Sequence, residues 1–252
     1  MKTNKLAQTA ERFFEACRKI PFTQDHQIMD LTPVMKTLTH LKFDEGYVLE
    51  CRTPGNEGMG GVTTVYARRK DDPTPDDELL MDFSQGIPVK AEDDILVDME
   101  PEGHVTVDGS PESVWEFWLF HDMWRFLPLW WHANYDEETY ITDADSLLEI
   151  TKITPDIIDR YNEEDSIDST DNLPFGFTAT GIGNAIALCG DEFLLPSSTK
   201  NGELCEVIYT YWTEWGGLVR ERIQAMVSSG RVIFIGQPLD VKLVEYDCGI
   251  MF

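Results

Sequence analysis

Residues 111–131 read PESVWEFWLFHDMWRFLPLWW, a stretch that holds five of the seven tryptophans of the chain. Ser110, Pro111 and Glu112 form a helix-start signal, because serine caps a helix and proline fits its first position. The rings do not share one side of a helical wheel, and a helix that is apolar nearly all round is buried or covered by a partner. The stretch therefore predicts a buried, central Trp-rich helix.

Before this stretch, the apolar residues from Leu6 to Ile20 recur at steps of three and four, which predicts a helix that ends at Pro21. Five stretches then alternate apolar with polar residues between turn clusters, as antiparallel strands do. These strand candidates are residues 47–52, 62–70, 79–83, 95–99 and 104–109.

After the Trp-rich stretch, residues 143–150 and 154–161 are typical of short helices, the second begun by Thr154 and Pro155. The remaining segments predict strands, with one helix closed by Gly230. The predicted strands are residues 172–190, 203–212, 231–236 and 240–246, and the predicted helix is 216–229.

These elements predict an α+β fold with antiparallel sheets, flanking helices and the Trp-rich helix at its centre. Residues 1–110 form a helix plus a β-rich half, and residues 111–252 form an α+β half. At 252 residues, the two halves are expected to pack together as one compact unit.

The charge of the chain is strongly negative, with 46 acidic residues against 20 basic ones and a net charge of −26. Such a field repels phosphate backbones and anionic lipids, so direct binding to nucleic acid or to a membrane surface is not expected. It favours a basic protein partner. The alternative is that the charge only keeps the protein in solution.

The location is predicted from the cysteines and the first residues. The five cysteines are scattered and form no CxxC pair, so they are expected to be buried thiols in a reducing compartment. The N-terminal residues lack the apolar run of a signal peptide, and charged residues with Pro128 interrupt the Trp-rich stretch. We therefore expect a cytoplasmic protein.

Motifs of cofactor or metal chemistry are weak. TGIGNA (180–185) resembles the start of a dinucleotide-binding GxGxxG, but Ile186 stands at the third glycine position, so no cofactor is expected. His121 and His132 lie eleven residues apart with Pro128 between them, so no metal site is expected. No nucleophile motif is present, although a catalytic carboxylate pair without a motif stays open.

A group of aromatic and acidic residues follows Pro128. Exposed rings beside carboxylates suit an interface for a cationic partner, whereas the alternative is that the segment belongs to the core. The predicted interface residues are Trp130, Trp131, Tyr135, Asp136, Glu137, Glu138 and Tyr140.

The order of features between Asn172 and Ser229 resembles the later half of the SUKH superfamily: LPFGF, the stretch TGIGNAIALCG read as a strand, a turn at Asn201-Gly202, the strand GELCEVIYTYW and the helix GGLVRERIQAMVSS. Many members are bacterial immunity proteins with an α+β fold and no enzymatic activity. The resemblance implies a protein that neutralises a toxin.

The sequence therefore favours a non-enzymatic protein that binds a basic protein, in its most concrete form an immunity-type inhibitor of a basic toxin or effector. A hydrolase that uses unmarked carboxylates with His121 or His132 is the first alternative. A structural or regulatory subunit is the second, and self-association through an apolar patch would favour it.

Overall fold

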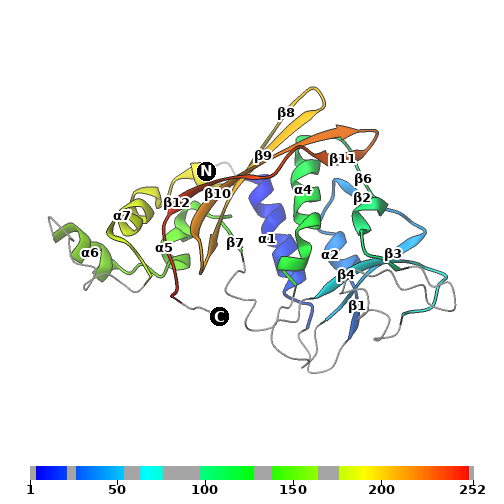
Figure 1. Ribbon diagram of the computed structural model, residues 1–252, viewed down its shortest axis with the longest axis horizontal. Helices are drawn as coiled ribbons and strands as arrows, with labels where there is room; N and C mark the ends of the chain where they lie inside the picture. Colours follow the sequence, from blue (N-terminus) through cyan, green and yellow to red (C-terminus); the bar gives the residue numbers. More distant parts are fainter. Residues whose placement is uncertain are drawn as a thin grey trace. The chain divides into compact units, whose positions relative to one another are not determined.

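The computed structural model describes residues 4–21, 27–53, 63–75, 97–127, 138–163 and 176–249 (Figure 1). The chain divides into two compact units. Unit 1 comprises Met1–Ala10, Tyr135–Met226 and Phe234–Phe252, and unit 2 comprises Glu11–Asn134 and Val227–Ile233. Helices and antiparallel sheets are both present, which confirms the α+β class.

Most strands of unit 2 belong to an antiparallel sheet with the order β1-β3-β4-β5. A separate antiparallel pair joins β2 to β6. The bounds are β1 Ile28–Asp30, β2 Leu41–Phe43, β3 Tyr47–Arg52, β4 Thr64–Arg69, β5 Val97–Asp98 and β6 Val105–Val107. The predicted strands at 47–52, 62–70, 95–99 and 104–109 are confirmed over the residues that the structure describes, and 79–83 lies outside these residues.

The Trp-rich helix is α4, Pro111–His121, and its side chains are buried from Ser113 to Phe120. The Ser110 side chain accepts a hydrogen bond from the Ser113 amide, so the predicted cap is confirmed, as is the burial of the helix itself. The helix is shorter than the stretch 111–131, since it ends at His121, and Trp124 beyond it is 43% exposed. Large aromatic side chains bury more area than any others, and Trp115 is completely covered here. This burial makes α4 the central helix of unit 2.

Helix α1, Lys5–Cys17, confirms the first predicted helix. Its residues Phe13 and Phe14 contact the ring of Phe126, which follows α4, with ring centres 6.1 and 4.6 Å away. The remaining helical segments of this region are short: α2 Thr32–Met35, and the 3-10 turns Pro101–His104 and Met123–Arg125.

Unit 1 contributes most of a six-stranded antiparallel sheet. The long strands β9 and β10 pair from Thr213 and Gly217 to Leu204 and Met226, and the shorter strands flank them. The bounds are β7 Thr139–Tyr140, β8 Ser197–Asn201, β9 Leu204–Thr213, β10 Gly217–Ser228, β11 Arg231–Phe234 and β12 Leu239–Val244.

The helices of unit 1 cover one end of β9 and β10 (Figure 1). Their core includes Leu147 and Ala185 from helices and Trp212, Leu218 and Val244 from strands, all buried. The bounds are α5 Leu147–Ile150, α6 Pro155–Glu163, α7 Ala179–Leu188, and the 3-10 turns Ala144–Ser146 and Glu192–Leu194. No helix in the described ranges is long and apolar enough to cross a bilayer.

Two sequence predictions are wrong. Residues 217–228 form the strand β10 instead of a helix, because Val219, Glu221, Ile223 and later odd residues face inward in a strict period of two. Residues 179–188 form the helix α7 instead of a strand, with the Thr178 side chain capping the amide of Gly181.

The glycines of α7 are required by its neighbours. A Cβ at Gly181 would meet the backbone oxygen of Glu245, and a Cβ at Gly183 would meet the hydroxyl of Tyr161 on α6. Glycine inside a helix costs about 0.5–1 kcal/mol relative to alanine. The close packing of α7 therefore uses glycines that a sequence reading assigns to a turn or to a phosphate-binding loop.

Candidate functional site

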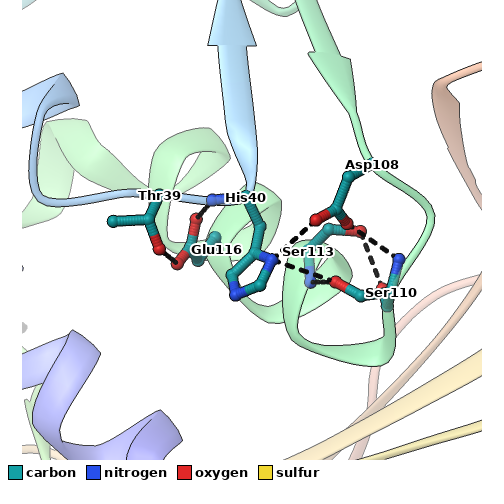
Figure 2. A network of polar contacts seen from close by, with 6 residues as sticks. All are labelled: Thr39, His40, Asp108, Ser110, Ser113 and Glu116. Carbon is teal, nitrogen blue, oxygen red and sulfur yellow. Dashed lines mark hydrogen bonds and ion pairs between the residues drawn. The ribbon is translucent and has the colours of Figure 1, made fainter.

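Six polar residues form a hydrogen-bonded network in unit 2, which we call the His40 network (Figure 2). Thr39 and His40 precede β2, whereas Asp108 and Ser110 lie in the connection from β6 to α4. These segments meet because β2 pairs with β6. The six members are Thr39, His40, Asp108, Ser110, Ser113 and Glu116.

The imidazole of His40 is held through one nitrogen. Its Nδ1 lies 2.7 Å from Asp108 Oδ2 and 3.2 Å from Ser110 Oγ. The hydrogen bond with Asp108 raises the pKa of His40 above 6.5, although partial burial acts in the opposite direction. Within the described residues, Nε2 has no hydrogen-bond partner, so it can face an external group.

Asp108 is an exposed carboxylate that stays ionised. Burial would raise its pKa, but hydrogen bonds from Ser110 and His40 outweigh that effect and lower the pKa to about 2. The backbone amide of Ser110 donates to Oδ1 over 2.9 Å, while Oδ2 faces His40. The carboxylate is therefore fixed on both oxygens.

Serine, histidine and aspartate together invite comparison with a catalytic triad. In a triad, aspartate holds Nδ1 and serine approaches the opposite nitrogen, which accepts the serine proton. Here Asp108 and Ser110 both approach Nδ1 of His40. Ser110 Oγ also accepts the Ser113 amide over 3.1 Å as the helix cap. Ser110 is therefore a structural residue and not an activated nucleophile.

Glu116 is the buried end of the network, with 1% of its surface exposed. Its Oε2 accepts the backbone amide of His40 over 2.6 Å, and Oε1 accepts the hydroxyl of Thr39 over 3.4 Å. Burial raises the pKa of Glu116, and these hydrogen bonds limit the rise. The carboxylate thus ties the segment before β2 to the central helix.

Two more histidines of unit 2 contact carboxylates. His104 Nε2 lies 2.9 Å from Asp98, and His121 Nδ1 lies 2.9 Å from Glu102. His26 and His132 lie outside the described residues. No group of three or more His, Cys, Asp and Glu side chains suited to a metal ion occurs in the described part of the chain.

Two of the seven predicted interface residues are described, and both are buried: Glu138 is 8% exposed and Tyr140 is 5% exposed. The ring of Tyr140 stacks on Tyr209 with centres 4.7 Å apart. Tyr140 belongs to β7 of the unit 1 sheet, and Glu138 directly precedes that strand. The others, Trp130, Trp131, Tyr135, Asp136 and Glu137, lie outside the described residues, so the interface stays a prediction.

A second set of carboxylates lies on α5, α6 and the segments around them, and we call it the acidic helical surface. All six of its members are exposed: Asp143, Asp145, Glu149, Asp156, Asp159 and Glu163. The same stretch contains two basic residues, Lys152 and Arg160. Lys152 pairs with Glu214 over 3.2 Å, which neutralises a charge outside the set. The surface therefore keeps a strong negative charge.

The cysteines differ from the prediction at one position. Cys17, Cys51, Cys205 and Cys248 are buried thiols, as expected, whereas Cys189 is exposed. Burial raises the pKa of Cys51 to about 12, and the charge of Glu50 adds to the rise. The buried thiol is therefore a poor nucleophile.

Comparison with protein-family models, with curated proteins and with solved structures found no match for this chain. Two elements quoted for the SUKH resemblance have the other secondary structure, since TGIGNAIAL is a helix and GLVRERIQAMVS is a strand. The element order behind that resemblance therefore differs from the one observed.

Proposed function

We propose that the protein is a non-enzymatic cytoplasmic binding protein whose acidic helical surface receives a basic protein partner. The observation that carries the proposal is the excess of six exposed carboxylates over two basic residues between positions 143 and 163. A concentrated negative surface steers a cationic partner and speeds its association. An inhibitor that occludes the basic site of a toxin or effector is the most concrete form of this function.

The geometry supports binding through a preformed surface. Leu147 of α5 is fully buried, and Ile157 and Ile158 of α6 pack against the same core. The Asp143 side chain accepts the amide of Asp145 over 2.9 Å, which fixes the turn before α5. A partner therefore meets carboxylates whose backbone is already ordered, and this lowers the entropic cost of association.

The proposal is tested with the triple variant Glu149→Lys, Asp159→Lys, Glu163→Lys. These residues are exposed, and the variant spares the first turn of α6, where Asp156 favours the helix. The matched control is Glu11→Lys, Glu15→Lys, Glu203→Lys, which changes the charge equally at exposed positions elsewhere. Tagged proteins are incubated in lysate of the source cells and washed at low and high salt.

We expect a basic protein that the wild type and the control triple retain and the acidic-surface triple loses, read by mass spectrometry. Titration of that protein in purified form should give a dissociation constant at least about tenfold weaker for the acidic-surface triple. Equal loss with both triples would mean that only the net charge acts, and equal retention would remove this surface from the site. Either result overturns the proposal.

A second candidate function rests on His40. Asp108 orients Nδ1 and raises the pKa of the imidazole, whose side chain is 35% exposed and whose Nε2 has no hydrogen-bond partner among the described residues, as a general base requires. If the protein is a hydrolase, His40→Gln should abolish hydrolysis of chromogenic ester and phosphate-ester substrates while Ser110→Ala retains it. Turnover that survives His40→Gln would exclude this role.

A further inference from the structure

Exposed apolar side chains are concentrated on one sheet. Nine large apolar side chains are exposed among the described residues, and seven of them belong to unit 1 on or beside β9, β10 and β12. These seven are Phe193, Leu204, Trp215, Met226, Ile235, Leu239 and Val241. An exposed apolar patch of this kind marks an interaction surface.

Strand β12 is the most exposed part of this patch. Leu239 and Val241 are 56% and 58% exposed, and Asp240 and Lys242 between and after them are exposed as well. One edge of β12 pairs with β10, and no strand of the described ranges pairs with its other edge. An unpaired edge that presents leucine and valine is a template for another strand.

The open part of this edge is short. At Leu243, the side chain of Asn184 on α7 donates a hydrogen bond to the backbone oxygen over 3.0 Å. Leu243 is also partly buried against the core under α7. The edge is therefore available along Leu239–Lys242, and only a short strand fits there.

We propose that β12 pairs antiparallel with β12 of a second copy of this chain, with the two copies of Val241 opposite one another at the two-fold axis. In a two-fold antiparallel pair, opposite residues lie on the same face of the sheet. One residue must therefore lie opposite its own copy, and the two-fold axis passes between these two copies. Three centres are then possible on the open edge beyond Leu239: Asp240, Val241 and Lys242.

The charges of β12 select one of these centres. An axis at Asp240 sets Asp240 against itself, and an axis at Lys242 sets Lys242 against itself, which is unfavourable. An axis at Val241 sets each Asp240 opposite a Lys242 of the second copy and gives two opposite-charge pairs. It also places Val241 against Val241, so the new ladder runs from Asp240 to Lys242 and does not use Leu243, whose backbone oxygen already binds Asn184.

The register also extends an exposed face of the sheet. Across the sheet, Leu239 is opposite Arg222 and Val241 is opposite Arg220, whose guanidinium lies 3.7 Å from the ring centre of Phe193. In the dimer, this face continues into the same face of the second copy. A ladder this short buries little area and gives a weak dimer.

Salt distinguishes this association from the binding proposed above. Each copy carries a net charge of −26, so two copies repel one another at long range. Added salt screens this repulsion and should strengthen the dimer, whereas it should weaken capture of a basic protein. The two proposals also use different surfaces, so either can fail alone.

Sedimentation velocity of the full chain from about 5 to about 500 µM tests the dimer. We expect a monomer–dimer equilibrium that tightens in high salt. Asp240→Lys and Lys242→Asp should each weaken it about tenfold, and the double variant should restore the wild-type constant within about threefold, because it restores two opposite-charge pairs.

The control is Glu203→Lys, an exposed change that lowers the net negative charge as much as Asp240→Lys does. By net charge alone, both variants should strengthen the dimer, so weakening by Asp240→Lys together with no weakening by Glu203→Lys supports the register. A protein that stays monomeric throughout overturns the proposal. So does an Asp240→Lys variant that dimerises like the control, or a double variant that is not restored.

Discussion

The strand pairs β3–β4 and β9–β10 each set a buried glutamate opposite a tyrosine. Glu50 is opposite Tyr66 in unit 2, and Glu221 is opposite Tyr209 in unit 1. In β9–β10, the Tyr209 hydroxyl donates to Glu221 over 2.6 Å. In β3–β4, Arg68 binds both oxygens of Glu50 instead, over 3.1 and 2.6 Å. A nearby cation, not the opposite residue, thus decides what holds a buried carboxylate.

The two tyrosines consequently differ in role. Burial raises the pKa of Tyr209 well above its ordinary value, so the phenol stays a hydrogen-bond donor. Burial, followed by the charge of Glu50 and a side-chain interaction with it, also raises the pKa of Tyr66, but no hydrogen bond of ordinary geometry reaches the Tyr66 hydroxyl among the described residues. Tyr209 therefore holds its carboxylate through a short hydrogen bond, whereas Tyr66 interacts with Glu50 more weakly.

The largest expected effect comes from removing the cation. Arg68→Met leaves the charge of Glu50 buried without compensation, so the free energy of unfolding should fall by about 3–5 kcal/mol in a denaturant titration. The double variant Glu50→Leu, Arg68→Met removes both charges and should recover most of that loss. A single variant as stable as the double would contradict the comparison.

The next effect separates the two tyrosines. Tyr209→Phe removes the donor to Glu221 and should lower the free energy of unfolding by about 1–3 kcal/mol. Tyr66→Phe removes a hydroxyl that makes no hydrogen bond of ordinary geometry and should change the free energy of unfolding by less than about 0.5 kcal/mol. Equal losses in matched denaturant titrations would show that the opposite residue matters in both sheets.

The smallest effect concerns the exposed pair His40–Asp108. The pKa of His40 is raised above 6.5, so the protonated imidazole stabilises the folded state. This contribution is fully present below pH 6.5 and is lost as the pH rises through the raised pKa. The pKa of Asp108 is lowered from 3.8 to about 2, so the ionised carboxylate also stabilises the folded state. This contribution is present above pH 3.8 and is lost as the pH falls toward 2. The pair is therefore most stabilising between pH 3.8 and 6.5.

Asp108→Asn should accordingly lower the pKa of His40 toward 6.5 in an NMR titration of the imidazole. It should also lower the melting temperature more at about pH 5 than at about pH 8. Ser110→Ala is the control, since it removes a helix cap and should lower stability at both pH values alike. A His40 pKa that Asp108→Asn leaves unchanged would contradict the pairing.

The sequence was sufficient where local signals agree with tertiary packing. Ser110 and Pro111 mark the start of α4, and its apolar surface predicts its burial. Local sequence signals gave the wrong secondary structure where a residue distant in the chain decides which side chain is needed. Glu221 interrupts the apolar alternation of β10, and its partner Tyr209 lies on another strand. Gly183 lowers the helix propensity of α7, but a glycine is required there because a side chain would collide with Tyr161.

The His40 network was out of reach of sequence reasoning for a similar reason. His40 meets Asp108, Ser110 and Glu116, which are 68, 70 and 76 residues away in the chain. Nothing around His40 resembles a motif, and the pairing of β2 with β6 is what brings the segments together. Only the cap at Ser110 is a local signal that points to this place.

Helix α6 should open more often than the strands of its unit. It contains no buried residue and is held by Ile157, Ile158 and the contact of Tyr161 with Gly183. An isolated helix of nine residues is marginal in water, so it persists only while these contacts last. Its amides should exchange their hydrogens with solvent sooner than those of β9 and β10. A protein bound to the acidic helical surface would therefore be detectable as slowed exchange in α6.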